Sequence, residues 1–257
     1  MTKQHAEEKE VALYTDQLPA ELAEHTGPTG LEGLDQGDFT YPFLKLAQVG
    51  TPQVKNKDDR IMGLEPGMFF SSLSGTIFGM ELKIVILKIV PTYTEWGSDK
   101  LGDFRRAYSP SEFRQLAGVK EGPEGKGWVT ASGTKITFGY NIFVLLPDFP
   151  EEGILVHTLT ATGIKHAKRI NTTLELQRLP SGAPAPTYAK VWKVIPGTEV
   201  SPKGEFYTWG SKGHTNFTAL GYCSAELFAR AKEAAQLLAS LDMNKVAAEP
   251  EQGELFT

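Results

Sequence analysis

Aromatic and basic side chains are interleaved in several segments of this chain. The pattern occurs in Tyr93-Thr-Glu-Trp96, Phe104-Arg-Arg-Ala-Tyr108, Lys126-Gly-Trp128, Lys190-Val-Trp-Lys193 and the run from Lys203 to Lys212. Binding of single-stranded nucleic acid without sequence preference uses this combination, because cations follow the phosphates and ring faces accept the bases. These segments therefore predict a nucleic-acid interface.

The same rings have a structural alternative, because large aromatic side chains also fill β-sheet cores. Within Phe206-Tyr-Thr-Trp209, strand alternation places Tyr207 and Trp209 on one face and Phe206 on the other. At most half of the rings can therefore face a ligand. We favour Trp96, Tyr207 and Trp209 as ligand-facing, since charged residues or glycines surround them.

The densest group of cations is Lys165, His166, Lys168 and Arg169, within five residues. As a strand end or a short helical segment it would present one basic patch to two or three phosphates, although a solvated turn is the alternative. A second group around Lys55 also contains two aspartates, which weakens it. The residues that we assign to the interface are Trp96, Arg105, Arg106, Tyr108, Lys126, Trp128, Lys165, Lys168, Arg169, Lys193, Lys203, Tyr207, Trp209 and Lys212.

The formal net charge of −5 conceals a segregation of sign along the chain. Residues 1–37 carry eight acidic residues against two lysines, and residues 242–257 carry four against one, so residues 38–241 have a net charge of +4. A basic middle with acidic ends suits a polyanionic ligand for which the ends compete. The alternative is that the acidic ends serve solubility.

An enzymatic interpretation finds weaker support. Asp58 or Asp59 followed by Glu81-Leu-Lys83 resembles the carboxylates and lysine of a magnesium-dependent nuclease, but no further acid completes that set. The five histidines have no partner at helical i,i+4 spacing, and there is no phosphate-binding loop motif. We therefore expect no enzymatic activity, no metal site and no cofactor.

Strand-forming sequence dominates from residue 38 to about residue 222. Apolar, β-branched runs occupy residues 82–90, 134–146, 153–162 and 187–195, and clusters of glycine and proline separate them. This spacing favours an antiparallel barrel over a parallel α/β sheet. We predict a mainly β fold (β-rich α+β) with an OB-like, closed or partly closed antiparallel barrel.

A C-terminal helix is predicted over residues 224–241. Ser224 is suited to the N-cap and Glu226 lies in the first turn. Docking of the apolar face on the barrel is the commoner outcome, and docking on a second subunit is the alternative. That face consists of Leu227, Ala231, Ala234, Leu238 and Leu241.

The predicted organisation is a flexible acidic N-terminal arm (1–37), one domain (38–241) that includes the helix, and a disordered acidic tail (242–257). No run of 18 apolar residues and no export signal is visible, so we expect a cytoplasmic protein without membrane association. The single cysteine, Cys223, excludes an intramolecular disulfide.

Three segments follow one another in the first half of the predicted domain: Tyr41-Pro-Phe-Leu-Lys-Leu-Ala-Gln-Val-Gly-Thr-Pro-Gln-Val, then Gly63-Leu-Glu-Pro-Gly-Met-Phe-Phe-Ser-Ser-Leu-Ser-Gly, then the run at residues 82–90. Their order resembles that of bacteriophage proteins regarded as single-stranded DNA-binding proteins. The resemblance extends loosely to the helix at Ser224. It implies an OB-like barrel that coats displaced single strands during phage replication or recombination in the infected bacterial cell.

The resemblance also implies a role for the C-terminal tail. In such proteins acidic residues followed by an aromatic ring recruit a polymerase, helicase or primase, and Glu254, Leu255 and Phe256 are similar. Here the acids are more dispersed and Thr257 follows the phenylalanine, which weakens the match.

A single-strand binder is thus the favoured function. A protein-interaction component of the virion or of host takeover is the alternative, and a metal-dependent nuclease is less favoured. A homo-oligomer is compatible with each of them.

Overall fold

The structure is a computed structural model that describes residues 41–55, 58–97, 104–123, 127–201, 204–211 and 214–240. The chain divides into two units, and all of these residues lie in the second, Gln36–Thr257. The expected arm at residues 1–37 and the expected tail at residues 242–257 lie outside the described residues.

Most of the described elements are strands, and the helices are short except for two. The strands are β1 (Leu44–Leu46), β2 (Phe69–Ser71), β3 (Ile77–Gly79), β4 (Leu82–Trp96), β5 (Phe104–Tyr108), β6 (Lys120–Glu121), β7 (Trp128–Val129), β8 (Lys135–Leu145), β9 (Ile154–Thr160), β10 (Lys190–Val194), β11 (Gly197–Ser201), β12 (Gly204–Thr208), β13 (Gly210–Ser211), β14 (His214–Thr215) and β15 (Phe217–Tyr222). The helices are α2 (Pro52–Lys55), α3 (Pro110–Gln115), α4 (Ile164–Glu175) and α5 (Ala225–Ser240), with 3-10 turns η3 (Pro150–Glu152), η4 (Ala161–Gly163) and η5 (Thr187–Ala189).

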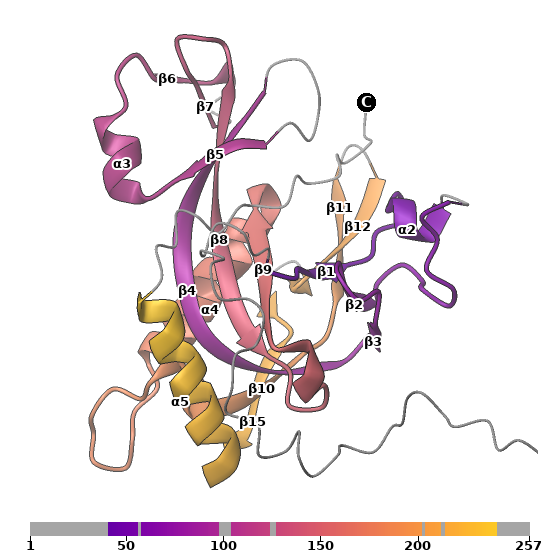
Figure 1. Ribbon diagram of the computed structural model, residues 1–257, viewed down its shortest axis with the longest axis vertical. Helices are drawn as coiled ribbons and strands as arrows, with labels where there is room; N and C mark the ends of the chain where they lie inside the picture. Colours follow the sequence, from indigo (N-terminus) through magenta and orange to yellow (C-terminus); the bar gives the residue numbers. More distant parts are fainter. Residues whose placement is uncertain are drawn as a thin grey trace, which may run out of the picture. The chain divides into compact units, whose positions relative to one another are not determined.

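The principal sheet has eight antiparallel strands in the order β15-β10-β4-β8-β7-β6, with β5 also pairing with β4 and β9 also pairing with β8. Figure 1 shows β4 as a long arc, with β10 and β15 at one end and β5, β6, β7 and α3 at the other. The sheet is a curled half-barrel. The predicted mainly β α+β class, with a partly closed antiparallel barrel and a C-terminal helix, is confirmed.

Both faces of the central strands are buried. In β4, Ile84 and Ile86 enter a first core shared with α4, whereas Val85 and Leu87 enter a second core shared with α5. In β8, Ile142 and Phe143 divide between the two cores in the same way. A strand covered on both sides is a continuous apolar run rather than an alternating one. Each fully buried side chain of this size contributes about 1.5–3 kcal/mol.

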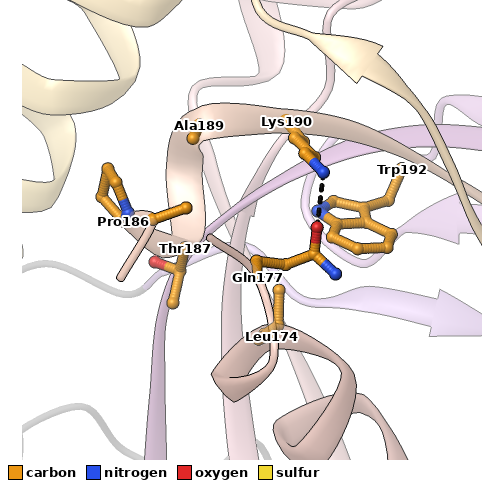
Figure 2. A pocket seen from close by; sticks show the side chains of 8 residues that line it. Leu174, Gln177, Pro186, Thr187, Ala189, Lys190 and Trp192 are labelled. Carbon is orange, nitrogen blue, oxygen red and sulfur yellow. Dashed lines mark hydrogen bonds between the residues drawn. The ribbon is translucent and has the colours of Figure 1, made fainter. Parts of the chain in front are cut away.

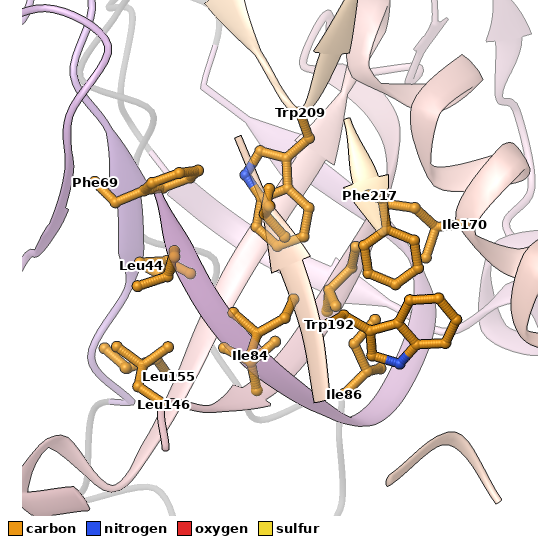
Figure 3. Packing of buried hydrophobic residues seen from close by; sticks show 14 of the residues in the cluster. Leu44, Phe69, Ile84, Ile86, Leu146, Leu155, Ile170, Trp192, Trp209 and Phe217 are labelled. Atoms are coloured by element: carbon orange, nitrogen blue, oxygen red, sulfur yellow. The ribbon is translucent and has the colours of Figure 1, made fainter. Parts of the chain in front are cut away.

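The first core is built around large rings (Figure 3). Trp209 has no exposed surface and packs edge-on against Phe69, with ring centroids 6.2 Å apart. Its indole also stacks on the imidazole of His157 at 4.2 Å and 12° between the planes. His157 is held in place by a 2.7 Å hydrogen bond from Nδ1 to the carbonyl oxygen of Leu44. This stack connects β9, β1 and the segment after β12.

Helix α4 was not predicted as a regular helix. Asn171, Thr172 and Thr173 have low helix propensity, and no side chain caps the N-terminus. The helix instead gains its stability from burial of Ala167, Ile170 and Leu174 in the first core. Tertiary packing commonly supplies most of the stability of such a helix, and local sequence does not show it.

Helix α5 confirms the C-terminal helix prediction. Ser224 Oγ accepts a 3.2 Å hydrogen bond from the Leu227 amide, and Ala231 and Leu238 are buried against the sheet. The helix has no basic residue in its last turn. Lys88, which follows a bulge in β4, supplies the charge by donating a 3.0 Å hydrogen bond from Nζ to the Leu238 carbonyl oxygen.

Burial of His157 makes the stability of the fold depend on pH. Burial lowers the pKa of His157 from 6.5 to about 4, against the opposing effect of its bond to the Leu44 carbonyl. As the pH falls, His157 is therefore protonated in the unfolded chain before it is protonated in the folded protein. The contribution of neutral His157 to stability is fully present above pH 6.5 and is lost as the pH falls toward 4. We expect the free energy of unfolding to fall by roughly 3 kcal/mol through this group.

The measurement is urea unfolding from pH 7 to pH 4 of the wild type and of His157→Asn, which keeps a donor near Leu44. The variant should be less stable at pH 7 but lose less stability on acidification. Parallel curves for the two proteins would contradict the assignment.

Candidate nucleic-acid interface

Beyond the region that α4 and α5 contact most closely, β4 and β8 continue into a part of the sheet that we call the distal extension. It consists of β5, α3, β6, β7 and the segments Tyr93–Trp96 of β4 and Lys135–Phe138 of β8 that pair with them. Gly127 permits the close approach of β7, because it has φ of 69° and a Cβ there would lie 2.5 Å from the Ile136 carbonyl oxygen. Figure 1 shows the distal extension at one end of the arc.

Strand register determines which side chains share a face of this extension, because directly opposed residues of antiparallel strands point the same way. One row runs Phe104, Trp96, Lys135, Val129 and Lys120 across β5, β4, β8, β7 and β6. The adjacent row on the other face runs Arg106, Glu95, Ile136, Trp128 and Glu121. We call these the Trp96 face and the Trp128 face.

The Trp96 face combines two rings with two lysines. The half-buried indole of Trp96 packs edge-on against Phe104 at 6.2 Å, and its Nε1 donates a 2.8 Å hydrogen bond to Thr137 Oγ1. Lys120 and Lys135 are exposed, and neither forms an ion pair with another described residue. The row itself contains no acidic side chain. An oriented ring beside two available cations can receive a base and its neighbouring phosphates.

The Trp128 face is a packed aromatic cluster under α3. Tyr93 stacks on Phe113 at 3.9 Å and 5°, and Trp128 contacts both rings at 5.3 and 4.9 Å. Phe138 lies 5.0 Å from Tyr93. A capping box between Ser109 and Glu112 begins α3 and so positions Phe113. These rings contact one another, and packing accounts for them.

Charges on the Trp128 face are compensated. Tyr108 donates a hydrogen bond to Glu95, which also accepts one from Thr134. Burial, followed by this bond to Glu95, raises the pKa of Tyr108 to about 12. Arg106 lies 5.0 Å from the centre of the Tyr108 ring and 3.4 Å from Glu112. Arg105 is exposed and also has a partner, while Tyr108 is buried.

The predicted basic cluster lies on α4, but a carboxylate occupies part of it. Lys165 and His166 both bind Glu199 of β11, the second through a 2.9 Å contact from Nε2. Burial lowers the pKa of His166 below its ordinary value, against the opposing pull of Glu199. Burial alone would raise the pKa of Glu199, but hydrogen bonds from Lys165 and His166 hold it below its usual range. Lys168 remains exposed and Arg169 is half-buried.

The other predicted residues lie in separate places. The Trp209 ring is enclosed in the first core, so neither of its faces is open to a base in this conformation. Gln48 holds the Tyr207 backbone through bonds of 2.9 and 2.7 Å, and Lys193 lies 3.6 Å from Glu81. The predicted interface residues Lys126, Lys203 and Lys212, and the predicted partner-binding residues Glu254, Leu255 and Phe256, lie outside the described residues.

Two residues of the nuclease alternative, Glu81 and Lys83, form ion pairs with other partners. Glu81 pairs with Lys193, and Lys83 pairs with Asp148 at 3.1 Å. Within the described ranges, no three acidic, histidine or cysteine side chains gather in a way that could hold a metal ion. Nor does any helix in that part of the chain combine the length and apolar character that crossing a bilayer requires.

A pocket at the end of α4 is too small for a nucleotide. Figure 2 shows Lys190 donating a hydrogen bond to Gln177 beside the indole of Trp192. The cavity has a volume of about 10 Å³, close to the space that one water molecule needs. It is lined by Leu174, Gln177, Ala185, Pro186, Thr187, Ala189, Lys190 and Trp192.

Lys120 and Lys135 were not among the residues predicted for the interface. Each stands apart from other cations in the sequence, and strand pairing alone brings them into one row with Trp96. The interleaved pattern at Phe104 to Tyr108 lies in β5 of the distal extension, but the local sequence could not give the register that aligns the other strands with it.

Comparison with known proteins gives one family. The family model described as Pam3 phage gp34-like protein matches residues 8–244. No curated protein and no solved structure matches the chain.

The aromatic cluster predicts a structural role for Trp128. Trp128→Ala should lower the free energy of unfolding by about 2–3 kcal/mol, because it removes the half-buried indole that packs against the stacked pair of Tyr93 and Phe113 and leaves a void beside them. Trp128→Phe should restore most of this loss. Urea unfolding of both variants measures the effect, and an unchanged midpoint for Trp128→Ala would show that the cluster is not tightly packed.

Proposed function

We propose that this chain, which belongs to the Pam3 phage gp34-like protein family, is a phage single-stranded DNA-binding protein that acts without enzymatic chemistry. On this proposal it coats displaced single strands in the infected cell through the Trp96 face of the distal extension. Contact of Glu254, Leu255 and Phe256 with a polymerase, helicase or primase remains part of the proposal on sequence grounds.

The observation that carries the proposal is the row of Phe104, Trp96, Lys135, Val129 and Lys120 across five strands. Neighbouring strands lie about 4.8 Å apart. Lys135 and Lys120 are two strands apart, so about 10 Å separates their backbones, and Trp96 lies directly beside Lys135. This places an aromatic surface and two cations within the reach of a few nucleotides.

The two faces of the extension differ in what they offer a polyanion. On the Trp96 face the lysines have no acidic neighbour in their row, whereas on the Trp128 face Glu95, Glu112 and Glu121 accompany the arginine. Uncompensated cations attract phosphates, and acidic neighbours repel them. The Trp96 face is therefore the better candidate.

The fixed indole favours single strands over duplex. Base stacking on a side chain requires a base that is free of its neighbours, and every base offers a flat face, so such contacts tolerate any sequence. The hydrogen bond from Trp96 to Thr137 holds the ring before the ligand arrives, which reduces the entropy lost on binding.

Removing the Trp96 ring tests the stacking contact. One stacked base contributes about 1–3 kcal/mol, so Trp96→Ala should weaken binding of a fluorescent oligo-dT at least several-fold at constant salt. Fluorescence anisotropy measures the affinity. Trp96→Phe should lose less, and Trp128→Phe is the matched control on the opposite face. Equal affinity for Trp96→Ala and the wild type would remove the Trp96 face from the proposal.

Charge removal tests the phosphate contacts separately. Each lysine that contacts a phosphate contributes about 0.7 to the slope of log affinity against log salt for single strands. A variant with Lys120→Ala and Lys135→Ala should therefore flatten this slope by about 1.4.

The matched control for charge removal combines Lys55→Ala with Lys232→Ala, two exposed lysines on α2 and α5 that are not among the residues assigned to the interface. It should leave the salt dependence unchanged. A flatter salt dependence in the control variant, with an unchanged slope in the variant with Lys120→Ala and Lys135→Ala, would place the phosphate contacts on the helices instead. Failure of the wild type to bind oligo-dT even at low salt would reject the proposed function and favour the protein-interaction alternative.

A further inference from the structure

Strand β15 ends the path of the principal sheet at the side away from the distal extension. It pairs with β10 along one edge, and none of the described strands pairs with its other edge. From Thr218 to Tyr222 every residue is exposed, while Phe217 is buried against Trp192. The backbone groups of such an edge are a template for another strand.

The composition of β15 is unusual for an outer strand. Its sequence, Phe-Thr-Ala-Leu-Gly-Tyr, contains no charged residue and no proline, the devices that commonly prevent strands from pairing at an edge. The opposite end of the sheet uses such a device, since β6 is two residues long and both, Lys120 and Glu121, are charged. One end of the sheet is thus protected by charge and the other is not.

Apolar side chains surround the unprotected edge. Leu220 is 49% exposed and Tyr222 is 56% exposed, and Lys190 lies over the Tyr222 ring at 5.1 Å. Phe228, at the start of α5, is 36% exposed and packs on Tyr188 two residues before Lys190. Backbone pairing along β15 would cover apolar surface in the same step.

We propose that β15 pairs antiparallel with β15 of a second copy of this chain, around a two-fold axis, so that two half-barrels share one continuous sheet. The charge pattern favours a second copy over another partner. When a strand pairs with itself around a two-fold axis, a residue next to the axis faces its own symmetry mate, so a charged residue there would meet its like. A strand without charges meets this condition.

The bulge in β15 limits the extent of this pairing. The register with β10 shifts between Val191 and Trp192, which leaves Leu220 without a directly opposed residue. Regular pairing is therefore centred on Phe217–Ala219, and Leu220 and Tyr222 add apolar contacts beside it. Because this edge is far along the sheet from the Trp96 face, dimerisation and DNA binding can be tested independently.

The first experiment measures mass in solution without DNA. Sedimentation equilibrium of the full chain should give about twice the mass of the 28.1 kDa chain at tens of micromolar, and Leu220→Lys should give the mass of one chain. Val200→Lys, on a side chain that is 82% exposed in β11, is the matched control and should stay dimeric. A monomeric wild type, or a dimer that Leu220→Lys leaves intact, would overturn the proposal.

A cysteine scan locates the axis. In a Cys223→Ser background, cysteine is introduced singly at Thr218, Ala219, Leu220 and Val200, and the proteins are oxidised. A disulfide requires Cβ atoms about 3.5–4.5 Å apart, so a position next to the two-fold axis should form a covalent dimer and Val200→Cys should not. Absence of cross-linking at all three β15 positions, or equal cross-linking at Val200, would also overturn the proposal.

Discussion

The pairing of β4 with β8 is the interaction on which the rest of the structure depends. The register extends from Val85 opposite Leu145 to Trp96 opposite Lys135, and it joins the two cores to the distal extension. A shift by one residue would exchange the two faces and move every apolar side chain to the wrong core. Burial on both faces prevents this shift, because α4 and α5 each require their own set of side chains. The same constraint that stabilises the fold therefore determines which residues accompany Trp96.

In the distal extension the side chains of β4 still alternate between the two faces of the sheet, but they no longer pack against α4 and α5. Near Ile84 and Val85 both faces are fully buried, whereas at Tyr93 and Trp96 the rings are only half-buried. One face of the distal extension is completed by α3, whose Phe113 stacks on Tyr93. On the other face, the half-buried ring of Trp96 lies in one row with the exposed lysines Lys135 and Lys120. A continuous sheet can thus provide a core at one end and a candidate binding surface at the other.

Sequence periodicity predicted the elements whose stability is local or whose burial is complete. The run at residues 82–90 and the helix beginning at Ser224 belong to this class. For α4 the sequence left a strand end or a short helical segment open and did not predict the twelve-residue helix, because its stability comes from Ala167 and Ile170 packing in a distant core. Trp209 shows that local sequence can also fail to indicate burial. Its glycine neighbour gives a local impression of exposure, yet the ring stacks on His157, more than fifty residues away in the chain.

Charge density along the sequence is a poor guide to available charge. The cluster at Lys165 and His166 is the densest in the chain, but Glu199 of a separate hairpin binds both side chains. Lys120 and Lys135 are isolated in sequence and become neighbours through two pairings with Val129. Coulomb attraction acts over distance in space, so a carboxylate across a hairpin cancels a cation as effectively as one beside it in the chain. The attraction that a polyanion experiences is therefore governed by strand register, and register in turn by the buried faces of β4 and β8.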